Sequence, residues 1–248
     1  KKIFYNFGQP DLYAFLKFLS HYPDSKILSV IQDPIQHLED LIYNGFEKLS
    51  GKDIQKDLNT VSTVNDKIIQ TILFINHPLN TVCNVGGVKL EDLIGAPNET
   101  MPKIAKWLDI TEVPELHGST FLDHPFLQAT SKTSISDQLL HKADKNVLDD
   151  LLDSKDRKIL ETLFWPLLNA FKYTKKDKNQ FNKDLEQIRP WLDKPLHFEK
   201  EFYAKIGEKT LSLESLDSYQ ALHRHLIHAW ELLNENHTYP NLIGSIID

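Results

Sequence analysis

A strand that runs directly into a helix near residue 33 could bind an anion. Residues 27–31 (ILSVI) have the pattern of a short apolar strand buried in a parallel sheet. Asp33 and Pro34 then favour a helix start, because the carboxylate caps free N–H groups and Pro needs none at the first helical position. Such a helix directs N–H groups and a positive dipole end toward the carboxyl edge of the sheet, where open α/β sheets bind anions. A structural turn without a ligand fits the same residues equally well.

The histidines near the C-terminus do not predict a metal centre. His225 and His228 are three residues apart, a spacing that could support a metal, and His223 and Arg224 lie beside them. No Cys or carboxylate completes a ligand set there, so a polar helix face is the better interpretation. We therefore expect no metal cofactor.

The elements that would position the residue-33 corner alternate between helix and strand, which is α/β organisation. We predict a helix over 10–19 and a second one from Pro34, whose apolar face consists of Ile35, Leu38, Leu41, Ile42 and Phe46.

Residues 51–65 are polar and predict a loop-rich segment, and a helix is expected over 66–76. Residues 81–90 are a weaker strand candidate, in which Gly86 and Gly87 indicate a turn or bulge.

The rest of the chain predicts mostly helices. Thr100 has the character of a helix cap, and residues 113–136 are expected to be irregular. Ser154 is expected to cap a helix that Pro166 bends. Three further helices are predicted, over 182–191, 198–206 and 215–236. The lysine-rich run 172–178 is most simply a solvated helix end.

Composition limits the class of protein. The 248 residues suffice for one large domain, and the net charge of −7 argues against a broad nucleic-acid surface. The lone Cys83 forms no internal disulfide, and no apolar run has the length of a membrane span. We therefore expect a cytoplasmic protein that binds neither nucleic acid nor membrane. The chain opens at Lys1, and its only methionine is Met101, which indicates a fragment or a processed N-terminus.

Three separated segments together resemble the sulfotransferase superfamily, most closely its bacterial-type branch. The segment 25–45 (SKILSVIQDPIQHLEDLIYNG) is similar to the strand, Arg-Asp-Pro and helix that hold the 3′-phosphate of the sulfate donor in that family. The segment 88–110 (VKLEDLIGAPNETMPKIAKWLDI) resembles the strand, Glu-Asp-Leu and helix, and 114–131 (PELHGSTFLDHPFLQATS) resembles the Thr-Phe-Leu-Gly-His-Pro loop. The stretches 190–202 and 219–243 also resemble the end of such proteins.

The resemblance covers nearly the whole chain in order and implies its fold. That fold is an α/β, P-loop NTPase-like three-layer sandwich with a short parallel sheet and a helix-rich C-terminal half. It implies one domain over 1–248, of which 137–248 is the helical C-terminal portion. The family's glycine-rich 5′-phosphosulfate loop has no counterpart from Lys1 onward, which agrees with a truncated N-terminus or with loss during divergence.

The resemblance also implies cofactor-binding residues. Gln32 stands where the family has Arg, and Asp40 stands where it has Ser. Gln32 still donates a neutral hydrogen bond, but the charged bidentate contact is lost. A carboxylate at Asp40 about 4 Å from a phosphate would repel it by roughly 4 kcal/mol at an effective dielectric of 20, although a solvent-facing helix residue is the equal alternative. His37 between them could add positive charge if protonated, but a half-exposed surface residue is the simpler interpretation.

Other implied roles are weaker. Arg224 could reach a phosphate, and Asp123 and His124 could line the acceptor side. The catalytic base is unknown, because the matching segment 7–10 holds no titratable side chain and Asp11 is better explained as a helix cap.

The first functional hypothesis is a sulfotransferase that moves a sulfuryl group from 3′-phosphoadenosine 5′-phosphosulfate to a hydroxyl or amine of a small-molecule or glycan acceptor. The alternative is a degenerate, non-catalytic protein of the same fold that binds a ligand or partner. A third is an unrelated α/β kinase-like domain that shares only the strand, Asp-Pro and helix. The sequence leaves the oligomeric state open.

Overall fold

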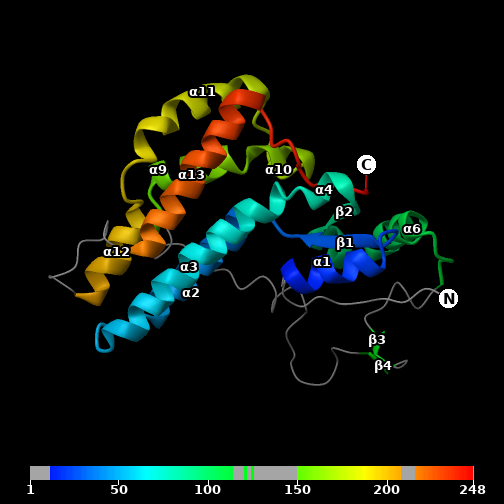
Figure 1. The fold of residues 1–248 in the computed structure, drawn as a ribbon, viewed down its shortest axis with the longest axis horizontal. Coiled ribbons are helices and arrows are strands. Elements are labelled where there is room, and N and C mark those ends of the chain that lie inside the picture. Colours follow the sequence, from blue (N-terminus) through cyan, green and yellow to red (C-terminus); the bar gives the residue numbers. More distant parts are fainter. Residues whose placement is uncertain (1–11, 114–119, 122–123, 126–149, 208–215, 248) are drawn as a thin grey trace.

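The computed structural model describes residues 12–113, 120–121, 124–125, 150–207 and 216–247. Over these residues the chain is mostly helical, with a small parallel sheet, in agreement with the α/β prediction (Figure 1). The helices are α1 Leu12–His21, α2 Pro34–Lys48, α3 Ile54–Ile75, α4 Leu79–Val82, α5 Leu90–Gly95, α6 Pro97–Leu108, α9 Ser154–Leu163, α10 Trp165–Ala170, α11 Lys178–Ile188, η2 (3-10) Arg189–Trp191, α12 His197–Ile206 and α13 Asp217–Asn236. The strands are β1 Lys26–Ile31, β2 Asn84–Lys89, β3 Thr120–Phe121 and β4 His124–Pro125.

Strands β1 and β2 pair in parallel, from Lys26 opposite Asn84 to Ile31 opposite Lys89. The predicted first strand is confirmed, but it is not buried along its length, since Ile31 is 4% exposed and Val30 is 52% exposed. Among the described residues β1 pairs only with β2. The outer edge of β2 is covered by the C-terminal segment, where the Gly87 N–H donates to the carbonyl oxygen of Gly244 at 2.8 Å.

The turn or bulge predicted at Gly86 and Gly87 is wrong, because β2 continues through both residues. The glycines are there for close packing. A Cβ at Gly86 would lie 2.2 Å from Ile246, and one at Gly87 would lie 2.4 Å from the ring of Phe171. β2 therefore lies closer to its neighbours than a strand with side chains at these positions could.

Helix α2 begins as predicted. Asp33 is its N-cap, and one carboxylate oxygen accepts from the N–H groups of Ile35 (2.9 Å) and Gln36 (3.4 Å). The predicted apolar face is confirmed, with Leu38 and Ile42 fully buried.

Helix α3 corrects the loop predicted over 51–65, since it begins at Ile54 and runs for 22 residues. Asp53 caps it, and the buried Asp57 accepts from the N–H groups of Ser50 (3.1 Å) and Gly51 (2.7 Å). Val61 and Val64 are buried although they lie five and two residues before the start of the predicted helix. The polar residues between Val61 and Val64 face outward, and they obscured the helical spacing of the apolar residues in the sequence.

Two predicted caps are also corrected. Helix α6 begins at Pro97, and the Thr100 hydroxyl lies inside it, donating to the carbonyl of Asp92 at 3.0 Å. Asp153, not Ser154, caps α9, because its carboxylate accepts the N–H of Lys155 at 2.8 Å.

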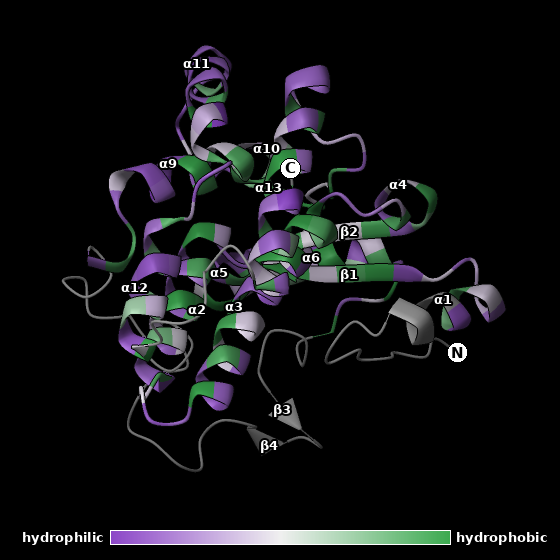
Figure 2. Ribbon diagram, turned by 60° about the vertical axis from the view of Figure 1, so that its left-hand side comes forward, coloured by the Kyte–Doolittle hydropathy of each residue, from purple (hydrophilic) through white to green (hydrophobic). Residues whose placement is uncertain are grey.

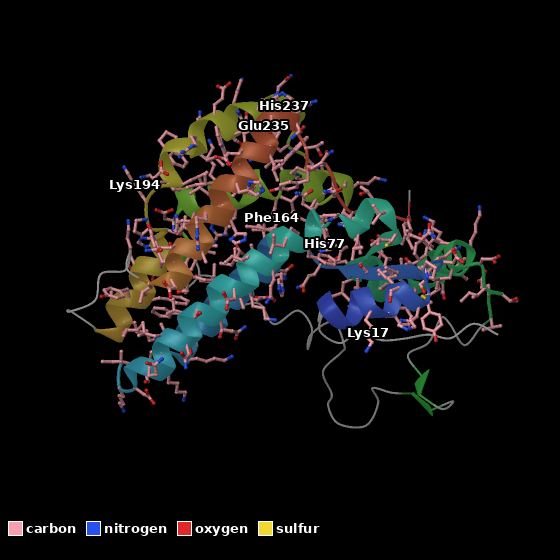
Figure 3. The ribbon with its side chains drawn as sticks, viewed as in Figure 1. Lys17, His77, Phe164, Lys194, Glu235 and His237 are labelled. Carbon is pink, nitrogen blue, oxygen red and sulfur yellow. The ribbon has the colours of Figure 1, made fainter. Side chains whose placement is uncertain are left out.

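The predicted C-terminal helices are confirmed as α9 to α13, except that the helix expected to bend at Pro166 is two helices, α9 and α10, with Pro166 in the first turn of α10. They enclose a core in which five phenylalanines are fully buried: Phe164, Phe171, Phe181, Phe198 and Phe202. Of the residues labelled in Figure 3, Phe164 is fully buried, whereas Lys194 in the bend before α12 and Glu235 of α13 are exposed. Figure 2 shows mostly hydrophilic residues on the visible side of α11 and a hydrophobic stretch along β1.

Of the segment expected to be irregular, residues 120–121 and 124–125 form a short antiparallel pair, and most of the rest lies outside the described residues. None of the helices in the described part of the chain is both long and apolar enough to cross a membrane.

Candidate functional site

The C-terminal ends of β1 and β2 lie side by side, because Ile31 pairs with Lys89 at the end of the ladder. The residues that follow each strand therefore meet at one edge of the sheet, beside the N-terminus of α2. We call residues 31–40, residues 89–92 and Tyr173 the sheet corner. Here the N–H of Asp33 donates to a carboxylate oxygen of Glu91 at 3.4 Å.

Tyr173 joins the two strands at the sheet corner. Its hydroxyl donates to the other Glu91 oxygen at 2.5 Å and lies 3.2 Å from the carbonyl oxygen of Ile31. Burial, reinforced by the hydrogen bond to Glu91, raises the pKa of Tyr173, so the hydroxyl remains a donor. The ammonium of Lys89 lies 4.7 Å from the centre of the Tyr173 ring and 3.8 Å from the carboxylate of Asp92.

The sheet corner is rich in carboxylates. Burial raises the pKa of Asp33, and the nearby charges of Glu91 and Glu161 raise it further, against the two helix N–H groups that lower it. Burial also raises the pKa of Glu39, which forms an ion pair with Arg157 of α9 that acts in the opposite direction. Burial and the neighbouring carboxylates thus both disfavour the charged form of Asp33.

Gln32 follows β1, and His37 and Asp40 lie in the first two turns of α2. Gln32 and Asp40 are half-buried, and the carbonyl oxygen of Asp40 accepts from the Asn44 amide at 2.7 Å. His37 is exposed, and partial desolvation of its ring lowers its pKa, although Asp40 acts to raise it. A neutral His37 adds no positive charge to the corner at neutral pH.

Arg224 lies on the exposed side of α13, where its Nε donates to the carbonyl of Gln220 at 3.2 Å. Among the described contacts, none joins Arg224 to the sheet corner. The Nδ1 of His225 donates to the carbonyl oxygen of Ala221 on the same helix at 2.7 Å, which agrees with the polar-face interpretation. Within the described residues no group of three or more His, Cys, Asp or Glu side chains could hold a metal ion.

The predicted acceptor-side residues are not placed at the corner. Asp123 lies outside the described residues, as do Asp11 and the segment 7–10 in which a catalytic base was sought. His124 belongs to β4 through its backbone pairing with Phe121, and its side chain is not described.

Sequence reasoning missed the roles of Glu91, Tyr173 and the Glu39–Arg157 pair. Glu91 could have been found, because it follows a strand whose parallel partner ends at the anion corner. The role of Tyr173 could not have been found from the sequence, because Tyr173 lies in the lysine-rich run 172–178, which was interpreted as a solvated helix end. In that run Lys176 is instead ion-paired with the buried Asp184 at 2.8 Å.

Comparison with models of protein families, with curated proteins and with solved structures finds no match. The chemistry of the corner must therefore be inferred from its own residues. The N–H groups that an anion would use are already bonded to the carboxylates of Asp33 and Glu91. An anionic ligand would have to bind beside these charges or displace Glu91.

Proposed function

We propose that this chain is a sulfotransferase-like protein that binds a ligand or partner without transferring sulfuryl groups. The fold proposed with it is a P-loop NTPase-like three-layer sandwich, and the compartment proposed is the cytoplasm. The observation that carries the proposal is the position of Glu91, whose carboxylate accepts from the N–H of Asp33 and from the hydroxyl of Tyr173. An intramolecular anion thus contacts the start of α2, near the position where the resemblance implies the 3′-phosphate of a donor.

Electrostatics support the same proposal. The two residues that would bind the phosphate are a neutral amide at Gln32 and an acid at Asp40, and His37 has a lowered pKa. The cations near the corner have other partners, since Lys89 contacts Asp92 and Arg157 pairs with Glu39. A carboxylate about 4 Å from a phosphate costs roughly 4 kcal/mol at a dielectric of 20, which is about a thousandfold in affinity.

A second candidate is an active sulfotransferase that uses 3′-phosphoadenosine 5′-phosphosulfate and a small-molecule or glycan acceptor. One observation favours it. The parallel strands, the Asp33 cap and the half-buried Gln32 agree with the strand-to-helix order that the resemblance implies for a 3′-phosphate site. Gln32 can still donate a hydrogen bond to a phosphate oxygen.

Calorimetry with 3′-phosphoadenosine 5′-phosphate tests the proposal. We expect weak or no binding by the wild type and clear binding by the double variant Gln32→Arg, Asp40→Ser, because it adds the forked cation and removes the repelling acid. The control is Gln55→Arg, Asp66→Ser, which makes the same change of charge at exposed positions of α3.

Each outcome decides a different part of the proposal. Tight binding by the wild type would overturn the non-catalytic interpretation and favour the enzyme. No gain by the corner variant, or an equal gain by the α3 variant, would overturn the assignment of this corner as a former 3′-phosphate site.

A further inference from the structure

A buried histidine joins three elements far from the sheet corner. His223 of α13 is 6% exposed and Glu199 of α12 is 1% exposed, and the His223 Nε2 lies 2.9 Å from a carboxylate oxygen of Glu199. The other ring nitrogen, Nδ1, lies 2.8 Å from the carbonyl oxygen of Leu192, which follows η2. The ring also lies against Tyr219, with the ring centres 4.2 Å apart.

The partners of His223 determine how many protons its ring carries. A carbonyl oxygen and a carboxylate oxygen are both acceptors, so each ring nitrogen must donate a hydrogen. Only the imidazolium has an N–H at both positions. A neutral ring would direct one lone pair at a buried acceptor, and a buried polar contact of that kind is costly.

The proton on the His223 ring also provides the counter-charge for the carboxylate of Glu199. The oxygen that bonds His223 also accepts the N–H of Leu196 at 2.9 Å, at the start of α12. The second oxygen of Glu199 is buried and has no partner among the described residues. The charge of Glu199 is therefore balanced chiefly by His223, and a neutral His223 would leave a buried carboxylate without a counter-ion.

We propose that His223 and Glu199 form a pH-sensitive latch, which holds α12 against α13 while His223 is protonated and releases it at alkaline pH. This inference does not depend on the proposed function. The latch joins α12, α13 and the end of η2, and one of its two ring hydrogen bonds is lost when one proton leaves the ring.

The charged groups around the ring set the direction of the pH response. Burial acts to lower the pKa of His223, but Glu199 from α12, the Leu192 carbonyl and Asp193 together raise it above 6.5. Asp193 is itself ion-paired with Arg189 at 2.7 Å, and the neighbouring Arg224 is turned to its own helix. Because the folded pKa exceeds the unfolded one, the stabilisation is complete below about pH 6.5 and is lost as the pH rises through the folded pKa.

Release of α12 would also weaken its contacts with α2. The helix buries Phe198 and Phe202, and the Phe202 ring lies 5.8 Å from the ring of Phe46 on α2. Lys205 of α12 also donates to the Phe46 carbonyl oxygen at 2.7 Å. Opening of the latch is therefore expected to loosen the C-terminal end of α2.

Nitrogen-15 NMR of the histidine rings tests the protonation state in the wild-type chain without any variant. We expect both His223 nitrogens to carry a hydrogen at about pH 6 and to titrate with a midpoint above 6.5. A ring with one protonated nitrogen at about pH 6 would overturn the latch, whatever the behaviour of any variant.

Site-resolved hydrogen exchange tests the release itself. After correction for intrinsic exchange rates, we expect protection of the α12 amides to fall between about pH 6 and about pH 9, by about tenfold for each unit by which the folded pKa exceeds 6.5. Glu199→Gln should abolish this pH dependence. His228→Gln should keep it, because His228 lies on the same helix with a side chain that is 65% exposed.

Either of two exchange results would overturn the proposal. One is protection of α12 in the wild type that does not change with pH. The other is the same pH dependence in Glu199→Gln as in the wild type.

Discussion

The sheet corner and the helical core are stabilised by different interactions. At the corner a short parallel pair is joined by hydrogen bonds among Asp33, Glu91 and Tyr173, and Val30 of the same sheet is 52% exposed. In the helical core five phenylalanines are fully buried between α9 and α13 and the helices they contact. Apolar burial stabilises the fold most where it is most complete, whereas the corner holds half-buried carboxylates and fewer buried apolar side chains. The difference separates the part that stabilises the fold from the part at which a ligand site is proposed.

The largest expected effect is in the helical core. Phe198→Ala should lower the free energy of unfolding by about 3–5 kcal/mol, because the ring is fully buried and packs edge-on against Phe202 at 5.7 Å. Urea denaturation followed by circular dichroism measures this loss of unfolding free energy. Tyr22→Ala, at a side chain that is 58% exposed, is the control and should change little. A loss below 1 kcal/mol for Phe198→Ala would mean that the core is not where stability resides.

The pH dependence of stability that Asp156 causes tests how burial in the helical core affects a carboxylate. Its carboxylate is 3% exposed and accepts the N–H groups of His197 (2.7 Å) and Phe198 (3.2 Å). Burial raises its pKa to about 6 although those hydrogen bonds lower it. The folded chain then holds the proton more tightly than the unfolded chain, so stability falls as the pH rises from about 4 through about 6.

Compared with Asp156→Asn, the wild type should lose up to about 3 kcal/mol of unfolding free energy between about pH 4 and about pH 7. Thermal and urea unfolding at several pH values measure the difference, with the exposed Asp66→Asn as control. A difference that grows in favour of the wild type as the pH rises would show that the two backbone hydrogen bonds outweigh burial.

Gly87→Ala tests whether the corner is also closely packed. The new Cβ would lie 2.4 Å from Phe171 and 3.2 Å from Ile31, so we expect a loss of about 1–3 kcal/mol in denaturant unfolding. Gly95→Ala is the matched control, because a Cβ there meets nothing within 4 Å. Equal effects of the two changes would refute the explanation of Gly87 by close packing.

The smallest expected effect concerns the cap of α2. Asp33→Ala should cost about 1 kcal/mol, since the N–H groups of Ile35 and Gln36 lose their acceptor. Asp33→Asn keeps an acceptor and removes a buried charge beside Glu91, so it should be neutral or slightly stabilising. If Asn costs as much as Ala in the same unfolding experiment, the negative charge of Asp33 is favourable and the corner is less crowded with carboxylates than proposed.

Local signals were sufficient where a segment makes its own structure. The strand at 27–31, the Asp33 cap and the apolar face of α2 depend on residues within a few positions of one another, and all three are confirmed. The start of α3 was missed because its buried positions are separated by polar residues. Gly86 and Gly87 were misinterpreted because a glycine pair has the same local signature in a turn and in a closely packed strand.

The sequence by itself determined the strand-to-helix corner and the helical second half of this protein, because hydrophobic period and capping are local properties of the chain. Only the tertiary structure decided what surrounds that corner. It placed Tyr173, 82 residues away, on Glu91, and it placed Glu91 on the N–H of Asp33, 58 residues away. Contacts between distant segments depend on how the packed helices and strands meet, and no local pattern encodes that. The fold therefore decided whether the start of α2 is available to a ligand's phosphate or bonded to the protein's own carboxylates.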